Sequence, residues 1–396
     1  MAVEISTMSD GIAAALASDD YITDPYPIYA RLRESPGWRA PSGYRVFSSY
    51  EDVQGILKQP NIFGQERVPY PNFHTYDPPE HTRLRRLVSR TFTAHSIGQL
   101  RDGIDATVAR ILDGLDGRTE FDLVNDFAVR VSASVITDIF QVSEEIGLRW
   151  HGWLMELARF RGRTNYFPPE ESGDPGALEA AKHANEEATE FMKDLLAKRS
   201  EIRDTGIVSG LLAAREKDDS LSEEEILYTL VLLIGAGLHT TSGQIGNTFR
   251  ALLRHPDQLE ELRREPAKIS NAVEEALRFE GALQAEYRVL RQQTELAGHT
   301  LEVGDHIIVV NAAANHDPAV FASPERFDVD RENARSHLSF GFGIHQCLGA
   351  ELARTEIRSA IRQVLVRYPK MALLGSGDQT PWDRWRSVAT LPVSVN

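Results

Sequence analysis

The chain contains one cysteine, Cys347, and the residues around it indicate what its thiol could do. It lies in a segment with the sequence FGFGIHQCLG, residues 340–349, and a helical pattern follows over residues 350–368. The dipole and unpaired N–H groups at a helix N-terminus stabilise a thiolate. Gly343 and Gly349 allow the backbone to turn tightly and to approach a flat ligand. A thiolate placed this way is suited to bind iron, whereas an isolated buried cysteine would more often be an inert small hydrophobic residue.

A second segment with side chains that could take part in catalysis lies at the centre of a long apolar stretch. It has the sequence AGLHTT, residues 236–241. In a helix, the Thr240 hydroxyl can donate to the carbonyl of residue 236, which opens the helix locally for a water molecule. His239 follows Leu238, and an unperturbed histidine titrates near pH 6.5 (about its ordinary pKa) and can move protons. His239 either relays protons or points away from a ligand and packs, and the sequence leaves both open.

The helix that carries this segment is expected to span residues 222–254. Ser222 and Glu225 match a capping box, and His255-Pro256 would end the helix. Four glycines interrupt it, each at a cost of about 1 kcal/mol relative to alanine, so something must approach its backbone closely. For the glycines alone, packing against another helix is favoured over contact with a ligand. They are Gly235, Gly237, Gly243 and Gly246.

The cysteine segment resembles the haem-binding signature of the cytochrome P450 family, Phe-x-x-Gly-x-x-x-Cys-x-Gly, at every position. The resemblance extends from about residue 24 to residue 393 and includes two further motifs. Residues 275–278, EALR, resemble the Glu-x-x-Arg pair of the family, and residues 324–327, PERF, resemble the segment whose arginine, here Arg326, completes an ion-pair triad. The family implies a mainly α fold with a small β region, a long central helix over haem b, and Cys347 as the axial iron ligand.

Haem carries two carboxylates, which need cationic or N–H donors in a partly dry site. His81 and Arg85 are four residues apart on a predicted helix and share a face. The resemblance assigns propionate binding to this pair and to Arg288 and His337. The cofactor-binding set that it implies is His81, Arg85, Gly237, Arg288, His337, Phe340, Gly343, His345 and Gly349.

The helix centre resembles the oxygen-binding motif of the family, Ala/Gly-Gly-x-acid-Thr-Thr/Ser, except that His239 occupies the acid position. The implied catalytic set is Thr240, His239 and Thr241, with dioxygen as co-substrate. Because thiolate ligation favours O–O cleavage, we expect oxidation rather than oxygen carriage. If His239 relays protons, the coupling of NADPH consumption to product should vary between about pH 5.5 and 7.5.

The expected function is therefore a haem-thiolate monooxygenase that hydroxylates or epoxidises a small organic molecule, in bacterial secondary metabolism or catabolism. His239 in place of the acid keeps two alternatives open: an oxidase that couples substrate radicals into C–C or C–N bonds, and a peroxide-driven haem enzyme. A non-catalytic haem sensor is a third alternative, although thiolate ligation beside Thr240 exceeds what binding requires.

Electrons must come from outside the chain, because none of its segments is suited to bind flavin or an iron–sulfur cluster. We expect an external ferredoxin or flavodoxin with its NAD(P)H reductase. Arg354, Arg358 and Arg362 form one row of the helix after Cys347, and with Arg83 and Arg86 they form a candidate docking surface for an acidic donor. Solvated helix charges are the alternative explanation of this row.

Composition limits the other partners. The chain has 396 residues with 43 Lys+Arg and 58 Asp+Glu, a net charge of −15, which opposes binding to nucleic acid or to an anionic membrane. With one cysteine and no signal-like start, we expect a cytoplasmic protein. The longest apolar run, residues 230–238, is less than half of the roughly 20 residues that cross a bilayer, and it should be a buried helix. We expect one domain over residues 1–396, with residues 1–20 flexible.

The elements that must position these residues are mostly helices, including residues 25–33 and residues 50–57, the latter capped by Ser48 or Ser49. The clearest strands are residues 44–47, 300–303 and 306–311, and a Gly304-Asp305 turn is expected to join the last two as a hairpin. Candidate substrate walls are the aromatic segments 63–76 and 159–167, completed by Leu283, Gln284, Val388 and Ala389. Their composition indicates a substrate with polar or carboxylate groups beside an apolar body.

Overall fold

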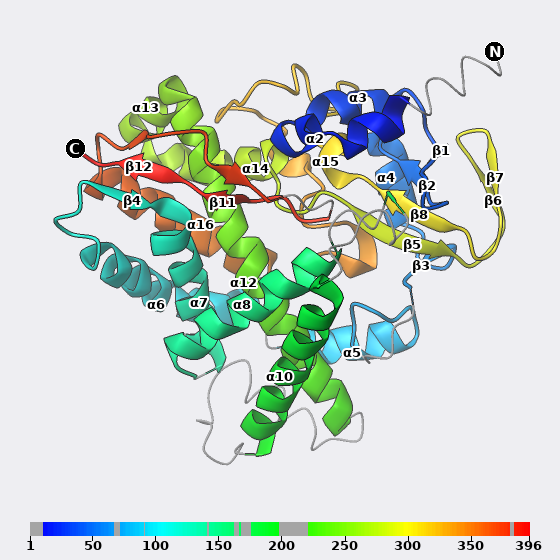
Figure 1. The fold of residues 1–396 in the computed structure, drawn as a ribbon, viewed down its shortest axis with the longest axis horizontal. Helices are drawn as coiled ribbons and strands as arrows, with labels where there is room; N and C mark the ends of the chain where they lie inside the picture. The colour runs from blue at the N-terminus through cyan, green and yellow to red at the C-terminus, as the bar shows by residue number, and fades with distance from the viewer. Residues whose placement is uncertain are drawn as a thin grey trace.

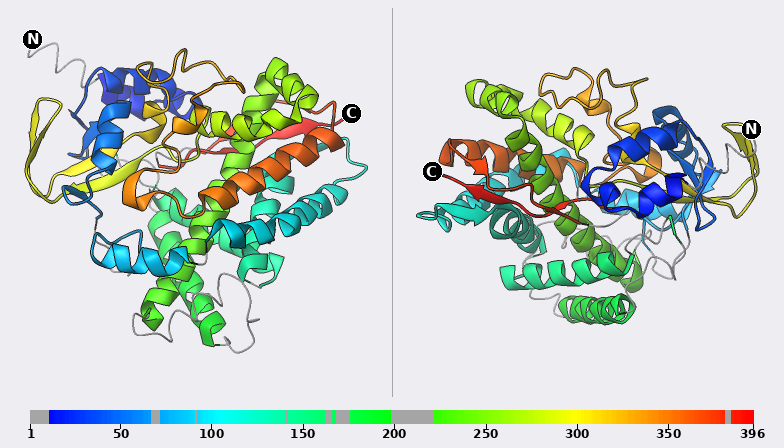
Figure 2. Two further views of the ribbon diagram at one scale, coloured as in Figure 1. Left: turned by 180° about the vertical axis from the view of Figure 1, so that it is seen from behind. Right: turned by 45° about the horizontal axis from the view of Figure 1, so that its top comes forward.

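The computed structural model describes residues 11–66, 72–90, 92–140, 142–161, 166–167, 176–197, 221–380 and 384–396. Helices form most of this structure, and the strands gather into small sheets, the largest of which lies at one side beside the N-terminal helices (Figures 1 and 2). The mainly α fold with a small β region is confirmed. The helices are α2 (Asp19–Thr23), α3 (Tyr26–Arg33), α4 (Tyr50–Leu57), α5 (Glu80–Ser89), α6 (Ala94–Asp113), α7 (Val129–Phe140), α8 (Glu144–Arg161), α10 (Ala177–Ala197), α12 (Glu223–Arg254), α13 (Pro256–Arg264), α14 (Ile269–Phe279), α15 (Asn311–Ala314) and α16 (Ala350–Arg367).

The long helix α12 runs through the middle of the molecule, as Figure 1 shows. Its capping box is present: the Glu225 amide donates to the Ser222 hydroxyl at 3.1 Å, and the Ser222 amide donates to the Glu225 carboxylate at 2.9 Å. It is also the helix in the described part of the chain that is long and apolar enough to span a bilayer, and 56% of its most apolar stretch is buried inside the protein. The predicted helix is confirmed, and Leu230, Ile234 and Leu238 are the buried residues of the run 230–238.

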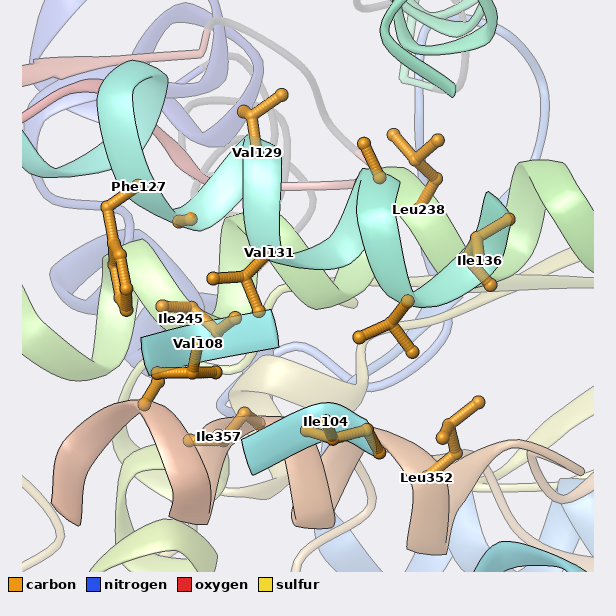
Figure 3. Close-up of a cluster of buried hydrophobic side chains, with 14 of the residues drawn as sticks. Ile104, Val108, Phe127, Val129, Val131, Ile136, Leu238, Ile245, Leu352 and Ile357 are labelled. Carbon is orange, nitrogen blue, oxygen red and sulfur yellow. The ribbon is translucent and has the colours of Figure 1, made fainter. Parts of the chain in front are cut away.

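The largest hydrophobic cluster joins α12 to α6, α7 and α16 (Figure 3). Ile245 of α12 and Ile357 of α16 are fully buried there, together with Val108 of α6 and Val131 of α7. Burying a side chain of this size contributes about 1.5 to 3 kcal/mol. This packing holds α16, and the cysteine segment before it, in a fixed position relative to α12.

The five-stranded sheet has the order β1-β2-β8-β5-β3, and β8 pairs parallel with β2 and antiparallel with β5. Further strands form three smaller sheets. The bounds are β1 (Trp38–Arg39), β2 (Arg45–Phe47), β3 (Phe63–Gly64), β4 (Glu120–Asp122), β5 (Glu286–Leu290), β6 (Thr294–Leu296), β7 (His299–Leu301), β8 (His306–Val309), β9 (Ala372–Leu373), β10 (Asp378–Gln379), β11 (Val388–Thr390) and β12 (Pro392–Ser394).

The expected hairpin across Gly304-Asp305 is wrong. The turn exists, with Gly304 at φ +94°, but β7 pairs with β6 and β8 joins the five-stranded sheet. The reason is burial, since Ile307, Ile308 and Val309 are all fully buried. A continuous buried run is typical of an interior strand with a neighbouring strand on each side. A hairpin with one short exposed strand would supply only one neighbour.

The N-terminal segment is also better ordered than the sequence indicated. Residues 11–17 are helical, and Ile12 and Leu16 are buried in a cluster with Tyr29 of α3. The segment expected to be flexible, residues 1–20, is therefore helical over residues 11–17 and packs against the protein there, while residues 1–10 lie outside the described residues. Two apolar side chains one helical turn apart were enough to dock this segment.

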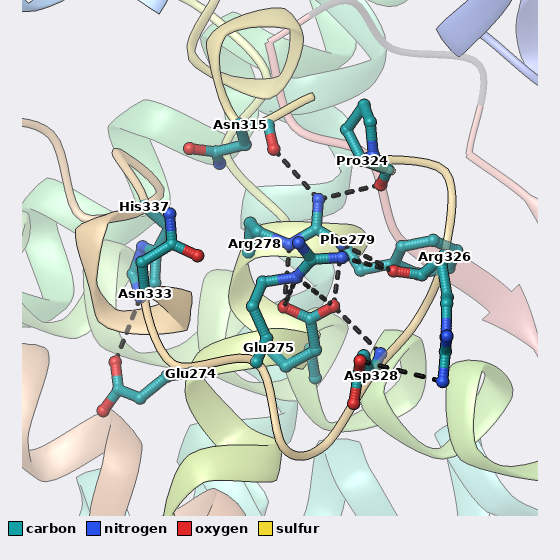
Figure 4. Close-up of polar contacts among 12 residues, drawn as sticks. Glu274, Glu275, Arg278, Phe279, Asn315, Pro324, Arg326, Asp328, Asn333 and His337 are labelled. Carbon is teal, nitrogen blue, oxygen red and sulfur yellow. Dashed lines mark hydrogen bonds and ion pairs between the residues drawn. The ribbon is translucent and has the colours of Figure 1, made fainter. Parts of the chain in front are cut away.

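A buried ion-pair triad ties α14 to the segment before the cysteine (Figure 4). Arg278 binds Glu275 through Nε at 2.7 Å and Nη2 at 2.8 Å, and both side chains are fully buried. The third member is Arg331, whose Nε lies 3.1 Å from both carboxylate oxygens of Glu275. The prediction of Arg326 is wrong, since its side chain is 67% exposed and only its backbone carbonyl accepts hydrogen bonds from the triad.

Candidate haem site

The cysteine segment is held by backbone contacts. The amide of Cys347 donates to the carbonyl of Phe340 at 2.8 Å, which closes the loop. Gly343 has φ +73°, and a Cβ there would lie 2.4 Å from the carbonyl oxygen of Leu57 at the end of α4. Only glycine fits this position, because an L side chain would be strained and would also collide with backbone. Gly349 is the N-cap residue of α16, as the sequence predicted for a cysteine placed just before a helix.

The thiol of Cys347 remains accessible, although protein surrounds it and desolvation raises its pKa. Three groups oppose this effect and favour the thiolate: the Gly349 backbone N–H, the Arg85 guanidinium and the Arg354 guanidinium. Hydrogen bonding and nearby positive charge are the means by which proteins stabilise a thiolate ligand. The chemistry of this environment fits the axial ligand of an iron porphyrin.

Two histidines beside the loop supply unused hydrogen-bonding groups. The rings of His81 on α5 and His345 lie with centroids 4.4 Å apart. The ring nitrogens of both are buried; those of His345 make no hydrogen bond within the described residues, and the His81 ring lies next to the Ile344 backbone. Burial, with the charge of Arg288 next, lowers the pKa of His345 to about 2, so its ring is neutral and can donate one N–H. Buried polar groups normally find a partner, and a carboxylate of bound haem would supply one.

Cationic donors come from two separate elements. Arg85 on α5 stacks over the Phe73 ring at 5.5 Å and donates to the Gln346 carbonyl, which brings its charge to Cys347. Arg288 on β5 is 4% exposed and lies close enough to His345 to lower that residue's pKa. The structure therefore brings four of the predicted cofactor-binding residues around the cysteine segment: His81, Arg85, Arg288 and His345.

His337 does not fit the role of propionate donor. Its Nε2 lies 3.1 Å from Oε2 of Glu274, and its Nδ1 accepts from the Ser339 amide at 3.1 Å, so both ring nitrogens have protein partners. Arg354 binds the same Glu274 carboxylate through Nε at 2.7 Å and Nη2 at 2.9 Å. His337 thus helps to tie α14 and α16 to the segment that leads to Cys347, and Figure 4 shows it beside α14. The sequence could not reveal this, because Glu274 is distant in the chain.

The α12 glycines pack against protein. A Cβ at Gly237 would lie 2.6 Å from Cδ1 of Ile136 on α7, and one at Gly243 would lie 2.7 Å from Cβ of Ser387. Helix packing, the favoured explanation for the glycines alone, is supported. The prediction that Gly237 contacts the cofactor finds no support, because its open side faces α7. Ala236 and Thr240, one turn apart, are instead the less buried positions of this stretch.

The catalytic set divides between two sides of α12. Thr240 is partly exposed, and its Oγ1 donates to the Ala236 carbonyl at 2.5 Å, as predicted. His239 is buried, with its ring 6.1 Å from His151 of α8 and 6.4 Å from Trp385, and Thr241 is buried as well. Desolvation, followed by His151, lowers the pKa of His239 to about 4. With this pKa the ring stays neutral between pH 5.5 and 7.5, which favours packing over the proton relay for His239.

The basic row on α16 is paired with acids. Arg354 is only 13% exposed and binds Glu274, so it is not part of an open surface. Arg358 pairs with Glu351 at 2.5 Å, and Arg362, 49% exposed, pairs with Asp105 at 2.6 Å. The charge of the row is therefore largely offset, and its exposed part is narrower than the sequence indicated.

The substrate walls are only partly described, because residues 67–71 and 162–165 lie outside the described residues. Gln284 is buried and accepts a hydrogen bond from the Tyr29 hydroxyl at 2.8 Å, which favours a structural role over a substrate contact. Val388 of β11 packs near Gly246. Trp385, which the sequence analysis missed, forms an isolated bridge with Leu283 and lies beside His239, so it places the C-terminal segment against α12.

Comparisons with known proteins agree with this geometry. The family profile for Cytochrome P450 matches residues 46–393. The chain is 32% identical over 410 residues to the biotin biosynthesis cytochrome P450 of Bacillus subtilis strain 168, covering 97% of this chain and 99% of that protein. It is 30% identical over 411 residues to the 6-deoxyerythronolide B hydroxylase of Saccharopolyspora erythraea, with coverage of 96% and 98%. The ligand-free crystal structure of CYP164A2 from Mycobacterium smegmatis superposes with a TM-score of 0.89 at 31% identity, covering 97% of this chain and 100% of that one.

Proposed function

Because the chain belongs to the cytochrome P450 family, it is a haem-thiolate monooxygenase, and we propose that Cys347 is the axial ligand of a haem b iron. The observation that carries the assignment is the setting of this one cysteine, where desolvation raises the pKa of the thiol and the Gly349 N–H, Arg85 and Arg354 oppose that effect. When bound, thiolate-ligated haem supplies the reductive activation of dioxygen and the cleavage of its O–O bond.

The protein side chains would hold the two haem carboxylates. Arg85 and Arg288 offer guanidinium donors, and His81 and His345 offer buried ring nitrogens. Charge-assisted hydrogen bonds of this kind are shorter and stronger than neutral ones. These contacts would orient the cofactor against the cysteine segment.

Thr240 is the residue proposed to handle protons. Its hydroxyl hydrogen points to the Ala236 carbonyl, so the oxygen of the hydroxyl can accept from a water molecule beside α12. A hydroxyl that both accepts and donates can hold a proton at Oγ1 and pass it on. His239 lies on the other side of the helix and is neutral near pH 7, so we propose that it shapes the wall formed by His151 and Trp385.

The substrate is proposed to be a small organic molecule with an apolar body, oxidised by hydroxylation or epoxidation in bacterial secondary metabolism. The related proteins include one named for biotin biosynthesis and one named for hydroxylation of 6-deoxyerythronolide B, which supports the class but not one compound.

For electrons, we propose an external ferredoxin or flavodoxin with its NAD(P)H reductase, in the cytoplasm and without nucleic acid or membrane as partner. The exposed part of the basic set, Arg86 and Arg362 with partly exposed Arg83 and Arg358, is the proposed contact surface. We also propose that residues 1–396 form a single domain.

The test begins with the carbon monoxide difference spectrum of the reduced, haem-loaded protein. A thiolate-type band supports the assignment, and its absence would contradict it. Product masses are then compared under NADPH with ferredoxin and reductase and under peroxide alone, using aromatic, terpenoid, macrolide and fatty-acid compounds. Oxygenated product only in the first arm supports the monooxygenase. Equal product in the peroxide arm would favour the peroxide-driven alternative, and coupled dimers would favour the oxidase.

A further inference from the structure

A buried acid lies beside one of the haem-carboxylate donors, and the sequence analysis did not single it out. Glu286 and Arg288 are two residues apart on β5 and therefore point to the same face of the sheet. The Glu286 Oε2 accepts from Nη2 of Arg288 at 2.9 Å, and the two side chains are 7% and 4% exposed. Desolvation opposes ionisation of Glu286, but Arg288 and the Asn311 amide together lower its pKa, so the carboxylate is charged.

Glu286 also contacts the segment that carries the iron ligand. Its Oε1 accepts from Nδ2 of Asn311 at 3.0 Å, and the same amide donates to the Leu338 carbonyl at 2.9 Å. A Cβ on Gly341 would lie 3.0 Å from Oε1, and Gly341 has φ +68°. The carboxylate is therefore fixed between β5 and the cysteine segment rather than free to move away from Arg288.

This arrangement changes the charge balance around the haem carboxylates. Two guanidinium groups, Arg85 and Arg288, would face the two carboxylates of haem, and of these two Arg288 is the one paired with Glu286. Glu286 offsets one of the two positive charges. Arg288 also donates Nη1 to the Tyr287 carbonyl at 2.7 Å, so part of its hydrogen-bonding capacity is used within β5.

We propose that Glu286 is a positioning residue that fixes the orientation of Arg288 and withdraws one positive charge from the haem-carboxylate site. The Glu286 carboxylate weakens the retention of haem, because it offsets the positive charge of Arg288. Its negative charge also makes reduction of the haem iron less favourable. The inference rests on the proposed function, because it requires haem at this site.

The test compares Glu286→Gln with the wild-type holoenzyme. Glu286→Gln removes a buried negative charge beside the haem carboxylates. Because charges interact strongly in a partly desolvated site, haem transfer to excess apomyoglobin should slow roughly tenfold. It should also shift the midpoint reduction potential to a more positive value, measured by dye equilibration. Unchanged or faster haem transfer, or an unchanged potential, would overturn the inference.

Two controls separate charge from structure. Glu286→Asp keeps the charge and should retain wild-type haem transfer within about threefold, while Glu295→Gln removes an exposed carboxylate on β6 and should change neither quantity. In an Arg288→Gln background, Glu286→Gln should alter haem transfer by less than about twofold, because the pair acts as a unit. A full tenfold gain in that background would show that Glu286 does not act through Arg288.

If the wild type lacks the thiolate-type carbon monoxide band, the proposed function fails. If the wild type shows that band and Glu286→Gln releases haem at the wild-type rate, only the inference on Glu286 fails.

Discussion

The hydroxyl of Thr240 donates a hydrogen bond to the carbonyl of Ala236, with Oγ1 and O separated by 2.5 Å. This carbonyl belongs to the helix ladder of α12, and a side-chain donor that shares it weakens the local backbone bond. The two residues lie one turn apart on the less buried side of the helix, whereas His239 and Thr241 are buried. The structure thus separates one exposed hydroxyl from its neighbours in the motif.

Thr240→Ala should raise the fraction of consumed NADPH that appears as hydrogen peroxide, because the hydroxyl that holds a proton near the oxygen site is lost. We expect product yield per NADPH to fall about tenfold, a typical size for the loss of one proton-handling group. Peroxide assay and product quantification in the same reaction measure this. Thr240→Ser keeps the hydroxyl and should retain most of the coupling, and equal uncoupling in both variants would argue against a proton role.

Cys347→Ala and Cys347→His should both abolish the thiolate-type carbon monoxide band, because the chain has no second cysteine to replace the ligand. The histidine variant should retain some haem, since imidazole is also an axial ligand of haem iron. Difference spectra of the reduced proteins, normalised to haem content, provide the measurement. A retained thiolate band in either variant is incompatible with the assignment.

Arg331→Ala should destabilise the protein by about 3 to 5 kcal/mol, because it leaves Glu275 buried with one partner fewer. Arg326→Ala is the matched control on the same segment, and its exposed side chain should change stability by less than about 0.5 kcal/mol. Denaturant unfolding followed by circular dichroism compares the two. If Arg326→Ala is the more damaging change, the assignment of the triad is incorrect.

His239 should affect stability rather than coupling near neutral pH. Its folded-state pKa of about 4 lies below the ordinary histidine value, so the unfolded chain binds a proton first as pH falls. The free energy of unfolding that His239 contributes is therefore present above about pH 6.5 and is lost as pH falls to about 4, a total of about 3 kcal/mol. His239→Gln should reduce the pH dependence of stability in this window.

The matched control for this prediction is His183→Gln on α10, whose side chain is 71% exposed, so the substitution should change the free energy of unfolding by less than about 0.5 kcal/mol. Coupling of NADPH to product in the wild type should not show a histidine titration between about pH 5.5 and 7.5. A coupling transition in that range that disappears in His239→Gln would restore the proton relay.

The cysteine proposed to bind iron and the residues that begin α12 and α4 could be predicted from sequence, because their signals are local. Cys347 with its flanking glycines, the Ser222 capping box and the Ser49 cap of α4 each depend on neighbours within a few positions. The backbone geometry that they require is set by those same neighbours, so tertiary structure had little to add.

Tertiary structure decided the pairings between distant residues. Arg331 rather than Arg326 reaches Glu275. In His337, Nε2 contacts the Glu274 carboxylate and Nδ1 accepts from the Ser339 amide, so neither ring nitrogen is left for a ligand. Burial lowered the pKa of His239, and the approach of Ile136 explains Gly237. Each outcome depends on which side chain is closest in space and how much water is excluded, and neither quantity is encoded in the spacing of a motif.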